Sequence, residues 1–214
     1  MASPSEVADL AGLLSAAAAD RPPPADGTVT VVDPPDPRSV GVFAFTAHHV
    51  ISAPVEPGWV RSVLPAGDLS APLNPPFLTA LTARTGRRIN NIDAVFVAAA
   101  PAGAPLDLRP GTDAEHARVA RARAHRADVR VWTVPGGVLV LGRGVAGRWE
   151  VAVEVDPAAQ DRGLGRTLFA GAVHLVPPGE PVWAQVAPGN AASIRAVLAA
   201  GYRPAGAEAL LVPA

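Results

Sequence analysis

The sequence predicts an α/β protein in which helices flank a mixed, mostly antiparallel sheet. Hydrophobic residues make up 49% of the 214 residues and aromatic residues only 5%, so a substantial core of small aliphatic side chains is expected. Three apolar segments between residues 128 and 156 are joined by short glycine-containing links, which is typical of antiparallel neighbours. The third segment leads into a glycine-containing turn and a helix-like run, so strands and helices alternate toward the C-terminus.

Elements of both kinds are predicted in residues 1–90, where proline-rich breaks separate them. Segment 74–86 reads as a helix because prolines stand near its start, leucines follow at helical spacing and Gly86 ends it. Further helices are expected at 5–19 and 57–65, and strands at 28–32 and 42–52. This region is expected to be an N-terminal extension or a small extra domain.

Residues 91–214 contain a longer alternation of strands and helices. Thr112 and Glu115 have the spacing of a capping box, which predicts a helix start. Asn190, with Ser193 three positions later, predicts a second helix start, and Gly201 stands where that helix should stop. Strands are expected at 92–100, 128–134, 136–144, 148–156, 182–187 and 207–214, and helices at 112–127, 165–176 and 190–200.

Missing residue types exclude several chemistries. The chain has no cysteine, which excludes disulfides, thiolate catalysis and cysteine-based zinc sites, and no metal site is expected. All 18 basic residues are arginine, which also excludes Schiff-base catalysis and a lysine-dependent phosphate loop. The formal net charge of −1 gives no reason to expect nucleic acid as a partner. The first residues lack the basic charge of a secretory signal and no apolar stretch could span a bilayer, so we expect a cytoplasmic protein.

The turn "QDRGLGR", residues 160–166, joins a strand to a helix and predicts an anion site. Successive unpaired N–H groups at a helix start can converge on one anion, and the helix dipole favours negative charge there. Gly163 and Gly165 allow close approach of a ligand, while Arg162 and Arg166 add positive charge around the rim. These features indicate a phosphate or pyrophosphate ligand.

Other phosphate-binding motifs fit this turn poorly. A dinucleotide-binding fingerprint requires a third glycine and an acidic residue after the next strand. Leu168 stands at the glycine position, and the strand at 182–187 offers no acid. A dinucleotide-dependent oxidoreductase is therefore a weak alternative.

Two motifs in the right order resemble those of the GNAT superfamily of N-acyltransferases. "QDRGLG" (160–165) resembles the family's coenzyme A pyrophosphate loop, and "VAPGNAASIRAVLAAGYRP" (186–204) resembles its second signature. The resemblance covers residues from about 92 to 214, so the expected domains are 1–90, of unknown role, and 91–214. Residues 1–90 would cover the acceptor site, form a degenerate second lobe, serve as a dimerisation arm or simply extend the core.

The resemblance implies a GNAT fold, an acyl-coenzyme A ligand and a mechanism. The strands before and after the loop splay apart, and the pantetheine arm lies between them. Acetyl-CoA or another acyl-CoA donates its acyl group by direct attack of an amine, supplied by a small molecule or a peptide, and a homodimer is compatible with this function. The residues implied in cofactor binding are Val153, Val155, Gln160, Asp161, Arg162, Gly163, Leu164, Gly165, Arg166, Asn190 and Ser193.

The sequence departs from the family at the positions that carry proton transfer. Val197 stands where many members have a tyrosine acid, and Gln185 where one branch has a glutamate base. The remaining candidates for moving the proton are Glu154, Glu150 and Gln185. The structural alternative for the two glutamates is an edge or buried carboxylate that meets a neighbouring arginine or a helix start. The functional alternative is a degenerate module that binds acyl-CoA as a sensor or interaction protein.

The dense basic run at 116–126 allows two interpretations. Arg118, Arg121 and His125 share one helical face. They form either a rim that attracts an acidic acceptor or the coenzyme's phosphates, or a solvated helix face compensated by Asp113 and Glu115.

Overall fold

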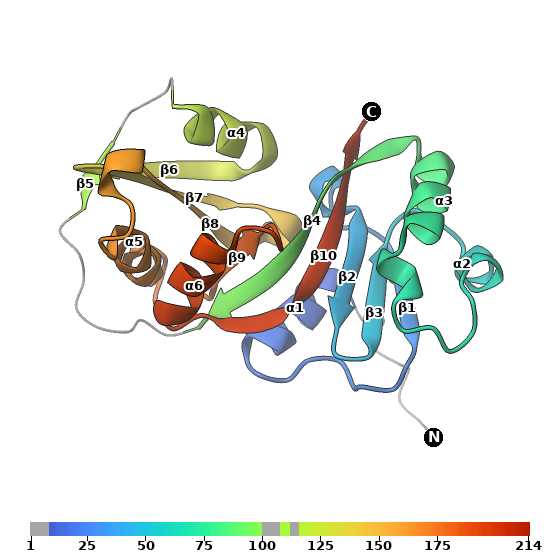
Figure 1. The fold of residues 1–214 in the computed structure, drawn as a ribbon. Coiled ribbons are helices and arrows are strands. Elements are labelled where there is room, and N and C mark those ends of the chain that lie inside the picture. Colours follow the sequence, from blue (N-terminus) through green and yellow to red (C-terminus); the bar gives the residue numbers. More distant parts are fainter. Residues whose placement is uncertain (1–8, 100–107, 112–115) are drawn as a thin grey trace. The chain divides into compact units, whose positions relative to one another are not determined.

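The computed structural model describes residues 9–99, 108–111 and 116–214. The chain forms two compact units: residues 1–92 with 206–214, and residues 93–205 (Figure 1). The last nine residues thus group with the first unit, although the sequence motifs place them in the second region. Each unit has its own part of a β-sheet, and the two are described separately.

The first unit is built on four strands in the order β1-β3-β2-β10. β1 and β3 are parallel, and the other pairs are antiparallel. Its elements are α1 (Leu10–Ala18), β1 (Val29–Val32), β2 (Gly41–Phe45), β3 (His48–Ser52), α2 (Pro57–Val63), α3 (Pro75–Thr85) and the end of β10 (Arg203–Pro213). The helices and strands expected in this region are therefore present, apart from the run at 42–52, which forms two strands; residues 5–8 of the first expected helix lie outside the described residues.

The run at 42–52, expected as one β-rich segment, is a hairpin. Phe45 pairs with His48, so only Thr46 and Ala47 turn the chain, and Ala47 takes a positive φ of 51°. Alternation along β3 then directs His48 and His49 to opposite faces of the sheet. The hairpin joins α2 and α3 around a core that contains Val42, Ile51, Val60, Phe77, Leu78, Leu81 and Leu211.

The second unit contains six strands in the order β4-β9-β8-β7-β6-β5. Only the pair β8–β9 is parallel, so the predicted mixed, mostly antiparallel sheet is confirmed. Its elements are β4 (Arg87–Ala98), β5 (Arg109–Pro110), α4 (Ala117–His125), β6 (Ala127–Val134), β7 (Gly137–Arg143), β8 (Trp149–Val155), α5 (Leu164–Ala172), β9 (Val182–Val186), α6 (Ala191–Ala199) and the start of β10. β4 begins five residues before the expected strand. Its first half is polar and only its second half is buried, so the apolar pattern of the sequence marks the second half alone.

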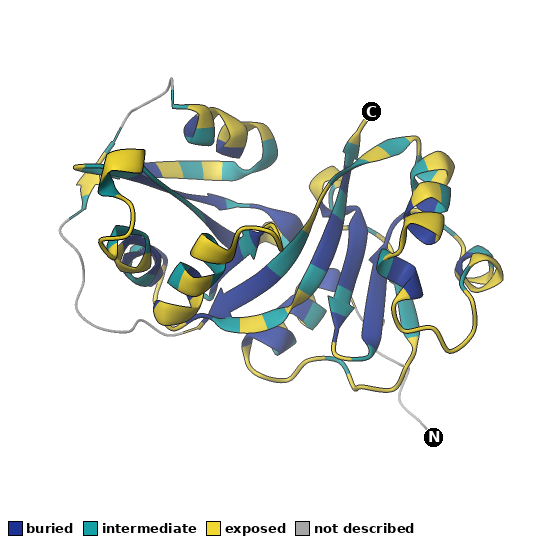
Figure 2. Ribbon diagram, viewed as in Figure 1, coloured by how far each residue is buried: buried dark blue, intermediate teal, exposed yellow. Residues whose placement is uncertain are grey.

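Helices cover both faces of this second sheet (Figure 1). α5 and α6 pack on one face, over a core that includes Leu139, Val151 and Leu168. α4 packs on the other face, where Val119 and Val140 are fully buried. Figure 2 shows this burial along the inner strands.

Tyr202 has a structural role in the second unit. Its side chain is 3% exposed, and its hydroxyl donates to the main-chain oxygen of Phe169 at 3.1 Å. Burial raises the pKa of this phenol above its ordinary value. Tyr202 therefore fills a packing position and holds α5 to the start of β10.

Candidate functional site

The parallel strands β8 and β9 separate halfway along their length. They pair at Trp149–Val182, Glu150–Trp183 and Val151–Ala184, and at no later position. Beyond this point β8 continues to pair with β7, and β9 with β4. The end of β8, residues 152–155, therefore has a strand partner on one edge only, and its other edge is free of strand pairing.

The main-chain amides at the start of α5 are unsatisfied by the protein. The first intrahelical bond runs from the amide of Thr167 to the oxygen of Gly163, at 3.0 Å. Among the described residues, the amides of 161–166 have no hydrogen-bond acceptor. No acidic residue lies in the first turn of the helix. Because these donors and the helix dipole act together, the helix start can bind an anion.

The two glycines of the turn have different physical roles. Gly163 is the N-cap of α5 with φ 82°, a left-handed conformation that favours glycine, and a Cβ added there would have no neighbouring atom within 4 Å. A Cβ on Gly165 would stand 3.7 Å from both Val155 Cγ2 and Ala196 Cβ. These are ordinary van der Waals distances, so packing against β8 and α6 does not by itself require glycine at 165.

Charged and polar side chains surround this helix start. Arg162 and Arg166 are exposed, and neither guanidinium makes an ion pair with a described residue. Gln160 donates its amide to the main-chain oxygen of Val155 at 3.3 Å, which ties the turn to the end of β8. Asp161 is exposed with a positive φ of 58°. The rim therefore carries two available cations and one carboxylate.

The second signature forms the start of α6 as expected. Asn190 is the N-cap, and its side-chain oxygen accepts from the amide of Ser193 at 3.0 Å. Asn190 is exposed and Ser193 half-buried. Val197, at the position of the family's tyrosine acid, is completely buried in the core. The structure thus packs α5 against β8 and α6 against α5 and β9, but it gives Val197 only a packing role.

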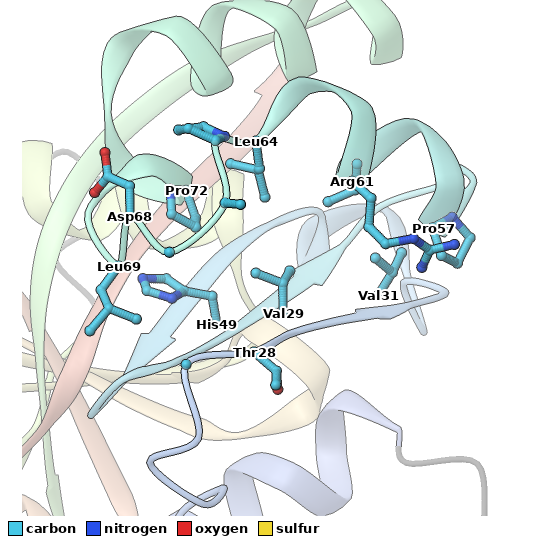
Figure 3. A pocket seen from close by; sticks show the side chains of 15 residues that line it. Thr28, Val29, Val31, His49, Pro57, Arg61, Leu64, Asp68, Leu69 and Pro72 are labelled. Carbon is cyan, nitrogen blue, oxygen red and sulfur yellow. The ribbon is translucent and has the colours of Figure 1, made fainter.

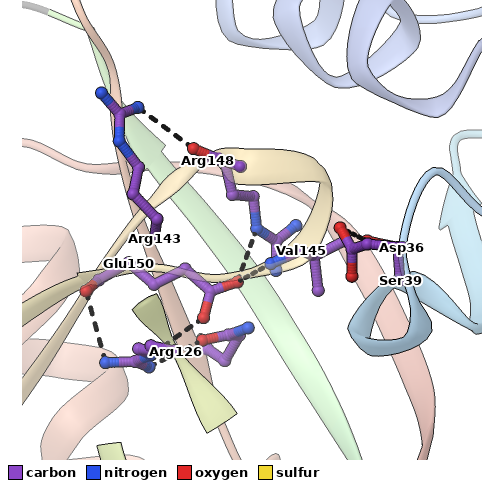
Figure 4. Close-up of polar contacts among 9 residues, drawn as sticks. Asp36, Ser39, Arg126, Arg143, Val145, Arg148 and Glu150 are labelled. Atoms are coloured by element: carbon purple, nitrogen blue, oxygen red, sulfur yellow. Dashed lines mark hydrogen bonds and ion pairs between the residues drawn. The ribbon is translucent and has the colours of Figure 1, made fainter. Parts of the chain in front are cut away.

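On the α4 face of β8, Glu150 is enclosed by two arginines (Figure 4). Its carboxylate accepts from Arg148 Nε at 2.9 Å, from Arg126 Nε at 3.0 Å and from the amide of Val145 at 3.1 Å. The side chain of Glu150 is 3% exposed. A methyl group on Gly144 would collide with this carboxyl group, so glycine is required there. Glu150 is the buried carboxylate of the structural alternative.

The pKa of Glu150 lies below its ordinary value. Burial by itself would raise this pKa, but the positive charges of Arg148 and Arg126 and the hydrogen bond from Val145 outweigh burial. The carboxylate therefore stays ionised at neutral pH and has little tendency to take up a proton.

The other two candidate catalytic residues lie on the same face. Gln185 accepts from Arg126 at 3.2 Å, so Arg126 links it to Glu150. Glu154 accepts from Arg118 Nε on α4 at 3.0 Å, and its side chain is 43% exposed. Of the three, Glu154 alone combines an ionisable group, solvent access and a place on the free edge of β8.

The basic run lies on helix α4, and the structure shows how this helix begins and which acidic residue pairs with Arg118. It begins at Ala117, where His116 caps it by accepting from the amide of Arg118 at 3.1 Å. The expected capping box and the compensating acids, Thr112, Asp113 and Glu115, lie outside the described residues. Arg118 is compensated by Glu154 on β8, a partner that the local sequence does not indicate.

Sequence reasoning also missed Arg126 and Arg148 as parts of this cluster. Arg126 is the C-cap of α4 and lies 24 residues from Glu150 along the chain. Arg148 is only two residues from Glu150, a spacing that carries no distinctive signal in a strand. The requirement for a bare backbone at Gly144 follows from the fold and not from any turn motif.

Neither a metal-binding cluster nor a membrane-spanning helix is found among the described residues. No group of three or more histidine, aspartate or glutamate side chains within residues 9–99, 108–111 and 116–214 could hold a metal ion. In the same part of the chain, no helix is long and apolar enough to cross a membrane.

The fold and the site define an α/β protein with splayed parallel strands beside an unsatisfied helix start. Among solved structures similar to this chain are a protein assigned to the GNAT acetyltransferase family from Novosphingobium aromaticivorans and a GCN5-related N-acetyltransferase from Kribbella flavida. The first match has a TM-score of 0.43 and 18% identity, and covers 60% of this chain and 68% of the other. The second has a TM-score of 0.41 and 20% identity, and covers 63% of this chain and 62% of the other. No protein-family model and no curated protein sequence matches the chain.

Proposed function

We propose that this protein is a GNAT-type N-acyltransferase that moves an acyl group, acetyl in the simplest case, from coenzyme A to an amine. The observation that carries this proposal is the free edge of β8 beside the unsatisfied amides at the start of α5. An extended, amide-containing arm can pair with a strand edge, while the diphosphate attached to it meets the helix start. A free phosphate would use only the second of these two features.

The residues beside the free edge of β8 and the start of α5 would bind different parts of coenzyme A. Val153 and Val155 offer main-chain groups to the pantetheine arm. The amides from Gln160 to Arg166, with Leu164 packed below them, receive the pyrophosphate, and Arg162 and Arg166 neutralise its charge. Asn190 and Ser193 approach the coenzyme from α6.

Acyl-CoA, when bound, supplies an activated thioester carbonyl. In the transfer, a bond forms between the amine nitrogen and the carbonyl carbon, the carbon–sulfur bond breaks, and the sulfur leaves with the electron pair. Glu154, directly or through water, takes the proton that the amine loses, and water protonates the sulfur because Val197 cannot. Most of the rate enhancement then comes from positioning the amine against the thioester.

Glu150 and Gln185 act as positioning residues in this scheme. Their contacts with Arg126 fix the C-terminal end of α4 against β8 and β9. The low pKa of Glu150 makes it a poor proton acceptor, so its contribution is to the shape of the face on which the amine would lie.

A degenerate acyl-CoA-binding module is the second candidate function. It is favoured by the burial of Val197 and by the arginine contacts of Glu150, which leave Glu154 as the one ionisable group among the three candidate catalytic residues that is partly exposed. Such a module would bind acyl-CoA through the same helix start and would not turn it over.

Thermal shift with CoA, followed by thiol release from acetyl-CoA, tests both candidates. We expect CoA to raise the melting temperature of the wild-type protein and Gly163→Asp to abolish the increase, because a carboxylate would then project into the anion site. Gly163→Asn is the matched control, since asparagine has nearly the same size, tolerates a positive φ better than most residues and carries no charge. Asn should retain much of the shift.

The outcomes separate the two candidates. Thiol release that depends on an added amine and falls in Glu154→Gln supports the transferase. A CoA-dependent shift without release for any amine in a broad panel supports the binding module. No shift with CoA or acetyl-CoA, in a protein that remains folded, would reject both. The domain division at residues 90 and 91, a homodimer and a cytoplasmic location stay predictions.

A further inference from the structure

The first unit contains a cavity of about 420 Å³ that the proposed acyl transfer does not use. All of its lining residues fall between Gly27 and Pro72, from β1, β3, α2 and the segment that follows α2. Its walls are mainly aliphatic, with Val29, Val31, Val60 and Leu64 among them (Figure 3). A volume of this size is typical of small-molecule sites.

A buried polar side chain, His49, opens into this cavity without a partner. The residue is 6% exposed, and neither nitrogen of its ring makes a hydrogen bond with a described residue. His48, on the opposite face of β3, differs in this respect because it bonds to Asp26, Thr28 and Thr30. Neither ring nitrogen is among the fully buried, unpartnered polar atoms of the described residues, so both remain accessible and can bond to a ligand in the cavity.

The pKa of His49 lies below its ordinary value, first because the ring is buried and second because His48 is close. The ring is therefore neutral at physiological pH. A neutral imidazole has one donor and one acceptor nitrogen, so it can bind a hydroxyl group in either direction.

A second available group, Arg61, lies at the other end of the cavity. Figure 3 shows its side chain extending along Val31 toward Pro57, whereas His49 lies beside Leu69 with Asp68 nearby. The guanidinium of Arg61 has no hydrogen bond or ion pair with a described residue. The carboxylate of Asp68 is held by the amide and hydroxyl of Ser70. The cavity is thus positive at one end, apolar in the middle, and polar with an acceptor at the far end.

We propose that residues 27–72 form a binding site for a small organic carboxylate with an apolar body and a hydroxyl group at its far end. Arg61 binds the carboxylate, the valines and Leu64 contact the body, and His49 bonds to the hydroxyl group. Asp68 excludes a second carboxylate from the His49 end, which sets the orientation of the ligand. This site has a different ligand chemistry from the proposed coenzyme site and is independent of that function.

Calorimetric titration of the full-length protein with 8-hydroxyoctanoate tests the proposal. We expect saturable binding with one site per chain. Octanoate, which cannot bond to His49, and octane-1,8-diol, which carries no charge for Arg61, should each bind at least about fivefold more weakly, as expected for the loss of one hydrogen bond.

Variants assign the two ends. Arg61→Gln should weaken 8-hydroxyoctanoate about tenfold and leave octane-1,8-diol unchanged, whereas Arg88→Gln, an exposed arginine of the same unit outside the cavity, should change neither. His49→Gln keeps a hydrogen-bonding group, while His49→Phe keeps a ring without one. We expect the Phe variant to bind 8-hydroxyoctanoate and octanoate with about equal affinity. The Gln variant should retain part of the preference for 8-hydroxyoctanoate. Melting temperatures without ligand show which variants fold.

Three results would overturn the proposal. The first is no heat of binding for 8-hydroxyoctanoate up to its solubility limit. The second is equal affinity for all three ligands, which would indicate non-specific apolar binding. The third is an equal effect of Arg61→Gln and Arg88→Gln, which would place the anion elsewhere on the protein.

Discussion

Glu150 and Glu154 show how two identical side chains on one strand face acquire different properties. Both point toward α4, but Glu150 meets the buried guanidinium of Arg148, the half-buried one of Arg126 and a main-chain amide, whereas Glu154 meets one partly exposed arginine. Distance from the solvent and the number of cations decide the difference. The first carboxylate is enclosed by the protein, whereas the second is 43% exposed to solvent.

We expect Glu150→Gln to lower the free energy of unfolding by about 3–5 kcal/mol, because the buried Arg148 and the half-buried Arg126 lose their compensating charge. Glu154→Gln is the matched control and should cost about 1 kcal/mol or less, since its ion pair is partly exposed. Urea unfolding at pH 7 measures both. Because the pKa of Glu150 is lowered by folding, its stabilisation is present above the ordinary glutamate pKa and is lost as pH falls below it. Equal losses in the two variants would contradict this assignment.

Asp26 provides a second, pH-dependent prediction. The hydroxyl and amide of Thr28, and then His48, hold its pKa at about 2, against an ordinary value of 3.8. Its contribution to stability is therefore complete above pH 3.8 and disappears as pH falls from there toward 2. We expect Asp26→Asn to lower the urea midpoint at pH 6 and the difference from wild type to shrink across that interval. Asp33→Asn, an exposed aspartate of the same unit, should show a smaller difference at pH 6.

At the scale of elements, local signals were reliable where capping or turn chemistry was decisive. Gly86 ends α3 with φ 65°, and Asn190 caps α6 through Ser193, as predicted. The single run at 42–52 was wrong because a two-residue turn through Thr46 and Ala47 contains no glycine or proline to mark it. Likewise, the polar first half of β4 shows no apolar pattern.

Replacing Asn190 separates its structural role from its proposed role in binding. We expect Asn190→Ala to lower stability by about 1 kcal/mol through loss of the N-cap, whereas Asn190→Ser keeps the cap and should cost only a few tenths. Chemical unfolding gives these values. If Asn190 also contacts coenzyme A, both variants weaken CoA binding, and a loss confined to the Ala variant would assign the residue to capping alone.

For the whole molecule, two strands limit how the chain can be divided. β4 starts in the first unit and ends in the second, and the C-terminal part of β10 pairs with β2. A cut between residues 90 and 91, as the sequence motifs suggest, would remove β2, one of the two neighbours of β10 in the sheet, and expose Ala209 and Leu211, which are buried in the first unit's core. The sequence boundary therefore follows the motifs and not the packing.

We expect a fragment of residues 91–214 to aggregate more readily than the full chain, because an unpaired strand edge and its apolar side chains would meet solvent. A fragment of residues 93–205 lacks those residues and is the control. Light scattering and sedimentation at equal concentrations compare the three proteins. If 91–214 is as soluble and monomeric as the full chain, the pairing of β10 with β2 contributes little to stability.

The α/β class, most of the helices and strands, and the strand–glycine–helix turn could be predicted from the sequence, because these depend on hydrophobic period and on local backbone chemistry. The folded structure was needed to show that β8 and β9 separate after Val151, that Arg126 and Arg148 enclose Glu150, and that His49 opens into a cavity. These features join residues far apart in the chain, whose meeting depends on register and packing, and neither quantity can be read from one segment.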